Sequence, residues 1–194
     1  MTGHGRARAV TALGLAFVLA GAALVAGTER SAEAASMGPH GDIGGGHNFG
    51  LGGHIGTEIG PSLKFWFGGG LALNVNAGLN HWYLGAAYGL RAEATLVWHF
   101  SIVQKPKWEM LIGPGVGGGI GYWRDWYYDV CSTDNRRGPD DCAGPYAKGL
   151  FHWSMLFHPW HFDVFAEPGF LLGVGIPGFF FWDWDFLAGV RYYF

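Results

Sequence analysis

Apolar and polar residues alternate along most of the chain after residue 46, and the clearest run extends from Leu90 to Phe100. Its even-numbered positions are all apolar, whereas most odd-numbered positions are polar, among them Arg91 and His99. A repeat of two residues places the two sets on opposite faces of a β-strand. The pattern therefore predicts strands with one apolar and one polar face.

The same alternation predicts eight strands separated by turn-forming residues. Their ranges are 49–56, 59–67, 71–79, 88–100, 108–120, 146–157, 162–174 and 183–194. Most reach the ~9–11 residues that a tilted strand needs to span a bilayer. An even number of strands fits a closed antiparallel barrel with both ends of the chain on one side. The short connections at 68–70, 104–107 and 158–161 then lie at one end, and the long one between Gly121 and Pro145 lies at the other.

The last predicted strand ends on an aromatic residue. Its apolar row consists of Phe186, Ala188, Val190, Tyr192 and Phe194. Asp185 and Arg191 fall on the opposite face. A terminal Phe preceded by apolar residues at every second position resembles the signal that the barrel-assembly machinery reads in outer-membrane barrels. We therefore expect this row to be an assembly signal and the machinery to be a partner.

The first 34 residues have the pattern of a secretory signal peptide. Arg6 and Arg8 precede an apolar run from residue 9 to residue 27, and Ala32 and Ala34 offer the small residues that a signal peptidase reads. We expect cleavage after Ala34, although an uncleaved membrane anchor is the alternative. A Gly-rich lead-in over residues 35–46 and an outer-membrane barrel over residues 47–194 would follow.

Composition narrows the class of protein. The chain has 35 glycines, 17% aromatic residues and only 14% charged residues, a mixture that argues against a helical bundle. A formal net charge of −3 supplies no basic field for nucleic acid, and nucleic-acid binding is set aside. After the signal peptide, no segment has the 18 uninterrupted apolar residues of a membrane-spanning helix.

The polar faces of the strands predict a filled interior. Small eight-stranded barrels have room inside for little more than side chains, and charges withdrawn from water must be paired. The expected lumen network consists of Lys64, Arg91, Glu93, Glu109, Glu167, Asp185 and Arg191. Glycines at alternate positions from 113 to 121 should make room for bulky inward residues or let the strand bend. Pro114 and Pro168 predict bulges or interrupted pairing.

An enzyme is a weaker interpretation of the same inward faces. His152, Ser154 and either Asp163 or Glu167 lie on neighbouring strands and have the types needed for Ser-His-acid chemistry. A lipid hydrolase would work at the lipid-facing wall, however, whereas these side chains should point inward. The expectation is therefore that the chain has no catalytic site. His99, His158 and His161 could meet as a metal site, but interfacial packing is the more ordinary role, and no metal or cofactor is expected.

Cys131 and Cys142 lie in the same polar stretch after the signal peptide. In an oxidising compartment we expect them to form a disulfide, because their spacing fits neither a redox nor a zinc motif. Their connection also carries aspartates and several aromatic residues, so it is a candidate binding site for an extracellular partner.

Aromatic residues gather near both ends of the predicted strands. One group contains Trp66, Phe67, Trp98, Phe100, Trp160 and residues 192–194, and the other contains Trp123, Trp126, Tyr127, Tyr128, Trp182 and Trp184. Two such groups, separated by small and aliphatic residues, are typical of the interfacial girdles of a membrane barrel.

At the level of these patterns, the chain resembles the small OmpA/OmpX-type outer-membrane barrels. Residues 88–100, residues 162–167 and the Arg-Tyr-Tyr-Phe end carry the resemblance. It implies an all-β, closed, antiparallel, eight-stranded transmembrane barrel in the outer membrane, with membrane lipid as a partner. It transfers no catalytic residue, and the leading hypothesis for function is a structural or surface-interaction role through the outer loops. The alternatives are a lipid-modifying acyl hydrolase and a soluble, lipocalin-like barrel that binds a small apolar ligand.

Overall fold

The structure is a computed structural model, and it describes residues 48–80, 88–124, 142–175 and 179–194. The chain divides into two compact units, Met1–Met37 and Gly38–Phe194, and every described residue belongs to the second. The expected signal peptide, the lead-in at residues 35–46 and Cys131 lie outside the described residues.

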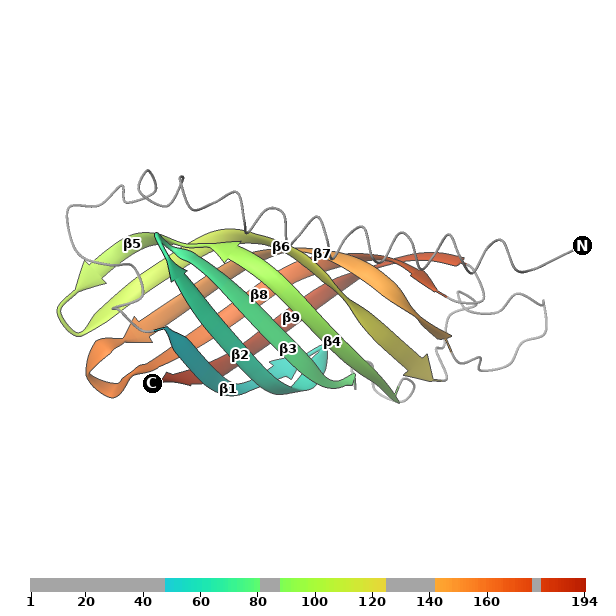
Figure 1. Cartoon of the computed structure of the whole chain (residues 1–194), viewed down its shortest axis with the longest axis horizontal. Coiled ribbons are helices and arrows are strands. Elements are labelled where there is room, and N and C mark those ends of the chain that lie inside the picture. The colour runs from blue at the N-terminus through green and yellow to red at the C-terminus, as the bar shows by residue number, and fades with distance from the viewer. Residues whose placement is uncertain (1–47, 81–87, 125–141, 176–178) are drawn as a thin grey trace, which may run out of the picture. The chain divides into compact units, whose positions relative to one another are not determined.

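Nearly all of the described chain forms β-strands, as the alternation predicts (Figure 1). The strands are β1 (Phe49–Gly56), β2 (Glu58–Gly68), β3 (Leu71–Asn80), β4 (Tyr88–Trp98), β5 (Phe100–Lys105), β6 (Trp108–Arg124), β7 (Cys142–Phe157), β8 (Phe162–Gly175) and β9 (Phe179–Tyr193). A short 3-10 turn, η3 (His158–Trp160), joins β7 to β8. The main difference from the predicted ranges is length, because β6, β7 and β9 extend further into the connections assigned to one end.

The strands close into a ring. β1 pairs with β2, β2 with β3 and β3 with β4; β1 also pairs with β9, and β9 leads back through β8 and β7 to β6. β6 then pairs with β4, and β5 continues the line of β4 beyond His99, where it pairs with the beginning of β6. All pairings are antiparallel, so β4 and β5 together occupy one of eight positions. The prediction of a closed, antiparallel, eight-stranded barrel is confirmed.

The offset at closure sets the dimensions of the barrel. From Leu51, successive partners around the ring lead to Trp182 on β9, whereas Leu51 itself pairs with Tyr192, ten residues further along that strand. With strands about 4.8 Å apart and about 3.3 Å per residue, this offset tilts the strands by about 40° and gives a backbone radius of about 8 Å. Side chains alone can fill so narrow an interior.

Prolines mark the places where a strand pairs on one side only. Pro114 pairs with Phe151 on β7, but it faces the break between β4 and β5 on its other side. Pro168 likewise pairs with Phe186 on β9, while the ladder between β7 and β8 is interrupted beside it. Proline has no N–H to donate, so it fits the wall of a sheet only where one ladder is broken. The predicted interruption of pairing is found at both residues.

The barrel has a turn end and a loop end. The connections after β2, β5 and β7 lie at the turn end, together with the beginning of β1 and the C-terminus (Figure 1). β1, β3, β6 and β8 end at the loop end. Within the described residues, no helix is long and apolar enough to cross a membrane.

Three aromatic residues that the sequence assigned to the rims lie inside the barrel instead. Trp66 and Trp123 are buried, and so is Tyr193 within the group at 192–194. Each follows the inward phase of its strand, because alternation decides the side on which an aromatic ring lies. The aromatic type of a residue did not decide this.

The glycines of β6 accommodate bulky side chains inside the barrel. A Cβ at Gly115 would lie 2.7 Å from Leu150 Cδ1, and one at Gly119 would lie 2.7 Å from the Tyr146 hydroxyl. A Cβ at Gly121 would collide with the Trp123 ring. Alternate glycines therefore give space to large inward residues, the first of the two roles that the sequence allowed.

Candidate functional site

The lumen is the most distinctive chemical feature of the described barrel. The side chains of all seven expected network members are buried. Asp163, which was also expected to point inward, is buried as well, and the structure adds further polar and charged residues to this inner face: His54, Glu58, Ser62, Asn74, Asn76, Thr95 and Lys148. The barrel is narrow, with a backbone radius of about 8 Å, so side chains that point inward from different strands approach one another across the lumen.

Arg91 is the centre of a cluster near the loop end. Its Nη1 donates to Asp185 Oδ1 at 3.0 Å, and its Nη2 donates to Glu93 Oε2 at 3.1 Å. Lys148 Nζ lies 2.5 Å from Glu93 Oε1 and 2.5 Å from Asp185 Oδ2, and the Tyr146 hydroxyl donates to Glu93 Oε2 at 3.0 Å. These five residues form the loop-end cluster, in which two cations bridge two carboxylates.

Glu58 and His54 extend the loop-end cluster towards β1. Glu58 Oε2 lies 3.6 Å from Arg91 Nε, and Glu58 Oε1 lies 3.3 Å from His54 Nε2. Thr57, which connects β1 to β2, donates its hydroxyl to Asp185 and its backbone N–H to the Phe186 carbonyl at 2.9 Å. The short connection between β1 and β2 is thus tied to β9.

Glu167 is the centre of a second cluster, in the middle of the barrel. Its Oε1 accepts hydrogen bonds from Asn74 Nδ2 at 2.6 Å, His152 Nδ1 at 2.9 Å and Arg191 Nη2 at 3.3 Å. Asn76 Nδ2 lies 3.4 Å from Glu167 Oε2 and 3.2 Å from Glu93 Oε1, which joins this central cluster to the loop-end cluster.

Lys64 extends the polar interior to the turn end. Its Nζ donates to His99 Nε2 at 3.0 Å and lies 3.8 Å from Asp163 Oδ2, which also accepts a hydrogen bond from the Tyr193 hydroxyl at 2.7 Å. His99 Nδ1 lies 3.0 Å from the Gly70 carbonyl in the turn after β2. Close polar contacts therefore run from the loop end of the barrel to the turn end.

Carboxylates outnumber cations in this interior. Buried Lys64, Arg91, Lys148 and Arg191 face buried Glu58, Glu93, Glu109, Asp163, Glu167 and Asp185. Glu109 is different from the others, because among the described residues neither of its oxygens has a hydrogen-bond partner and no cation lies within ion-pair distance of it. Charges buried inside a barrel cost free energy unless they are paired, and most of these groups do lie within hydrogen-bond or ion-pair distance of an opposite charge.

The candidate Ser-His-acid residues do not form a catalytic triad. His152 Nδ1 lies against Glu167, and His152 Nε2 lies 3.5 Å from Lys64 Nζ, an obligate donor. Ser154 Oγ has no hydrogen-bond partner among the described residues. Both ring nitrogens of His152 are therefore directed away from the serine, and no base is positioned to take the Ser154 proton. All of these side chains are buried inside the wall.

The three histidines considered for a metal site are separated by the barrel wall. His99 lies inside, while His161 is exposed on the outside with its ring centroid 6.3 Å from that of Tyr192. Within the described part of the chain, no cluster of His, Cys, Asp or Glu could hold a metal ion.

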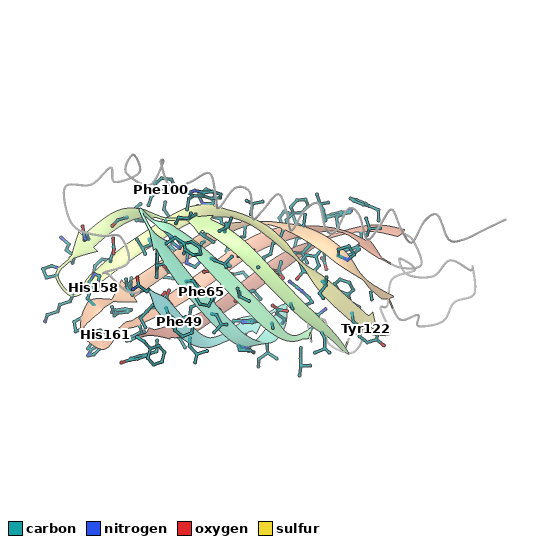
Figure 2. All side chains as sticks on the ribbon, in the orientation of Figure 1. Phe49, Phe65, Phe100, Tyr122, His158 and His161 are labelled. Atoms are coloured by element: carbon teal, nitrogen blue, oxygen red, sulfur yellow. The ribbon has the colours of Figure 1, made fainter. Side chains whose placement is uncertain are left out.

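Aromatic rings form a belt around the outside of the turn end (Figure 2). Phe49 packs against Phe65 and Phe194, with ring centroids 5.1 Å and 6.0 Å away, and Phe194 packs against Tyr192 at 5.2 Å. On the neighbouring strands Phe162 packs against Phe157 at 4.8 Å and Trp160 at 6.0 Å. At the loop end, Trp182 and Trp184 are exposed on the outer face of β9. The outer belts thus keep most of the residues that the sequence assigned to them.

Several residues of the lumen clusters were not predicted from the sequence. Lys148 follows the same alternation as His152, and Asn74 and Asn76 alternate with apolar residues in β3, so all three could have been recognised as inward. Glu58 was missed for another reason, because it lies one residue before the predicted start of its strand.

The remaining predictions about site residues concern the cysteines and the last strand. The side chain of Cys142 is not described, and Cys131 lies outside the described residues, so their disulfide stays a prediction. Phe186, Val190, Tyr192 and Phe194 are exposed on the outer face of the barrel, and Ala188 shares their phase. Phe194 donates its backbone N–H to the Phe49 carbonyl at 3.1 Å.

Comparison with known proteins gives one distant structural similarity. No protein-family model matches the chain, and no curated protein matches it. A solved structure, the N-terminal β-barrel domain of Pseudomonas aeruginosa OprF, aligns over 75% of this chain and 95% of that domain, with 14% sequence identity and a TM-score of 0.39. The description of this chain as an eight-stranded barrel therefore rests on its own strand pairing.

Proposed function

We propose that the protein is an integral outer-membrane β-barrel with a filled lumen, which acts as a structural or surface-interaction protein and not as a pore or an enzyme. The observation that carries the proposal is the distribution of side chains across the wall. Ionic and amide groups are buried inside, and large apolar side chains are exposed outside. A soluble barrel would have the opposite arrangement, with its apolar side chains inside.

The outer face supports a membrane setting. Exposed aliphatic residues such as Val116, Val164 and Val190 lie between the aromatic residues of the two ends. Closed barrels are also one of the two structures that can satisfy every backbone group in hydrocarbon. A lipocalin-like carrier would need a water-compatible exterior and an apolar interior, and neither fits this wall.

The inner face supports the non-porous part of the proposal. The loop-end and central clusters cross the lumen, and Arg191 packs over the Phe165 ring with 3.6 Å between the guanidinium carbon and the ring centroid. A cylinder with a backbone radius of about 8 Å leaves little space between such side chains. Interaction with a partner would then depend on the loop end, where the connection between β6 and β7 carries Trp126, Tyr127 and Tyr128 in its sequence.

Fractionation and bilayer recording test the proposal together. The full chain, expressed in a Gram-negative host, should sediment with outer membranes, require detergent for extraction and migrate differently on gels before and after boiling. Folded protein that stays in the aqueous fraction without detergent would contradict the membrane setting. Purified protein in planar bilayers should leave the conductance at its baseline, and a stable open-channel current would contradict the filled lumen.

A further inference from the structure

The exposed charge of the described barrel is concentrated at one place. Among the Lys, Arg, Asp and Glu side chains whose exposure the structure describes, only Lys105 and Lys107 are exposed. The remaining ones are buried inside the barrel, except Asp183, which is half-buried near the loop end. Lys105 is the last residue of β5, and Lys107 lies in the turn that leads to β6.

A backbone hydrogen bond holds this turn against the next one. The His158 N–H donates to the Lys107 carbonyl at 3.1 Å, so η3 lies beside the lysine turn. Immediately after η3, His161 adopts a left-handed conformation with φ of 54°, and its side chain is exposed. Lys105, Lys107, His158 and His161 together form the basic turn patch, and Figure 2 shows the two histidines at the turn end.

The basic turn patch borders exposed apolar side chains. Trp160, in η3 itself, is 64% exposed, and Ile102, three residues before Lys105 on β5, is 50% exposed. The nearest carboxylates in sequence, Glu109 and Asp163, are buried on the inner face and do not offset the patch at the surface. Cations that adjoin exposed aromatic rings are typical of the boundary between hydrocarbon and headgroups, where long Lys side chains reach for the phosphate level.

We propose that the basic turn patch binds the phosphate headgroups of anionic phospholipids in the leaflet next to the turn end. This inference rests on the proposed function, because it requires the barrel to span a bilayer. The Lys105 and Lys107 ammonium groups supply the attraction to phosphate, and the ring N–H groups of His158 and His161 can donate hydrogen bonds to it. Trp160 and Ile102 contact the acyl chains beside the headgroup.

The lysines set the size of the expected effect. Two lysines near an anionic surface contribute about thirtyfold in binding, and this contribution decreases as salt screens it. A zwitterionic lipid offers no net charge to attract them. The patch should therefore prefer phosphatidylglycerol to phosphatidylcholine by about this factor.

Native mass spectrometry of the detergent-solubilised full chain can measure this preference. Dioleoyl phosphatidylglycerol or phosphatidylcholine is titrated, and the lipid-bound fraction is compared among the wild type, the K105Q/K107Q double variant and the R136Q/R137Q double variant. The last variant removes two cations from the connection between β6 and β7 and serves as the matched control. Soluble polyglutamate is titrated as a further ligand, because it offers negative charge without acyl chains.

The expected result is an affinity for phosphatidylglycerol about thirtyfold lower in K105Q/K107Q, with unchanged binding of phosphatidylcholine and an unaffected R136Q/R137Q variant. Equal retention of phosphatidylglycerol by K105Q/K107Q would overturn the inference, as would an equal loss in R136Q/R137Q. If polyglutamate binds as tightly as phosphatidylglycerol, the lipid proposal is wrong, and the patch recognises acidic polymers in general. The heat-dependent gel shift separates the two proposals: a chain that shows no shift and needs no detergent refutes the membrane barrel, whereas an intact shift with unaltered lipid binding refutes only the patch.

Discussion

Glu167 and Glu109 provide a matched test of what the buried charges do. Both are glutamates on the inner face of the wall, and both side chains are fully buried. Glu167 accepts hydrogen bonds from Asn74, His152 and Arg191, whereas Glu109 has no hydrogen-bond partner among the described residues. The substitutions Glu167→Gln and Glu109→Gln preserve side-chain volume. The difference between their effects on the free energy of unfolding therefore measures what the hydrogen-bond partners of Glu167 contribute.

The expected magnitudes follow from these contacts. Glu167→Gln leaves the Arg191 guanidinium with Asp163 at 3.8 Å as its nearest remaining carboxylate, and it turns one acceptor oxygen into a donor. Breaking a buried charge pair costs about 3–5 kcal/mol, and the retained amide oxygen places the expected loss at about 3 kcal/mol. Glu109→Gln removes a desolvated carboxylate that has no hydrogen-bond partner in the part of the chain that the structure describes, so the free energy of unfolding should stay within about 1 kcal/mol of the wild-type value or rise.

Urea unfolding in lipid vesicles, followed by tryptophan fluorescence and by the heat-dependent gel shift, measures both free energies. We expect a urea midpoint well below that of the wild type for Glu167→Gln and an unchanged or higher urea midpoint for Glu109→Gln. Equal losses in the two variants would refute it, because burial alone would then explain the cost. A Glu167→Gln variant as stable as the wild type would show that the central cluster does not stabilise the barrel.

The remaining predictions concern the inner packing, the outer wall and the cysteines. Gly173→Ala places a methyl group against the Phe181 ring and should cost about 1–3 kcal/mol in the same unfolding assay, whereas Gly149→Ala, where nothing lies within 4 Å of the new Cβ, should cost little; similar losses would contradict the packing argument. Val116→Arg, in the middle of the outer face of β6, should cost about 2–4 kcal/mol in vesicles if that face meets lipid, and a neutral result would argue against a membrane setting. Alkylation of the unreduced, folded protein should label neither Cys131 nor Cys142, and mass spectrometry that finds both labelled would disprove the disulfide, which we expect to stabilise its loop by about 2–3 kcal/mol.

The sequence by itself determined the strands and most of their inward and outward faces. Alternation is a local property, since neighbouring side chains point to opposite sides of any strand. The residues at 91, 93 and 99 could therefore be assigned to one face before any partner was known, and an even strand count was enough to suggest closure. Aromatic type was a poor guide, because Trp66 and Trp123 follow the inward phase of their strands.

Only the tertiary structure decided which inward groups meet. Arg91 and Asp185 are 94 residues apart in the chain, and their contact depends on the ten-residue offset with which the ring closes. A different offset would keep every side chain on its face but change its neighbours along the barrel, and no local pattern specifies that offset. For the same reason the structure alone separates Glu167, which has several partners, from Glu109, which has no hydrogen-bond partner among the residues described. The physical cause is that the face of a side chain is set by its own strand, whereas its partners are set by the closure of the whole sheet.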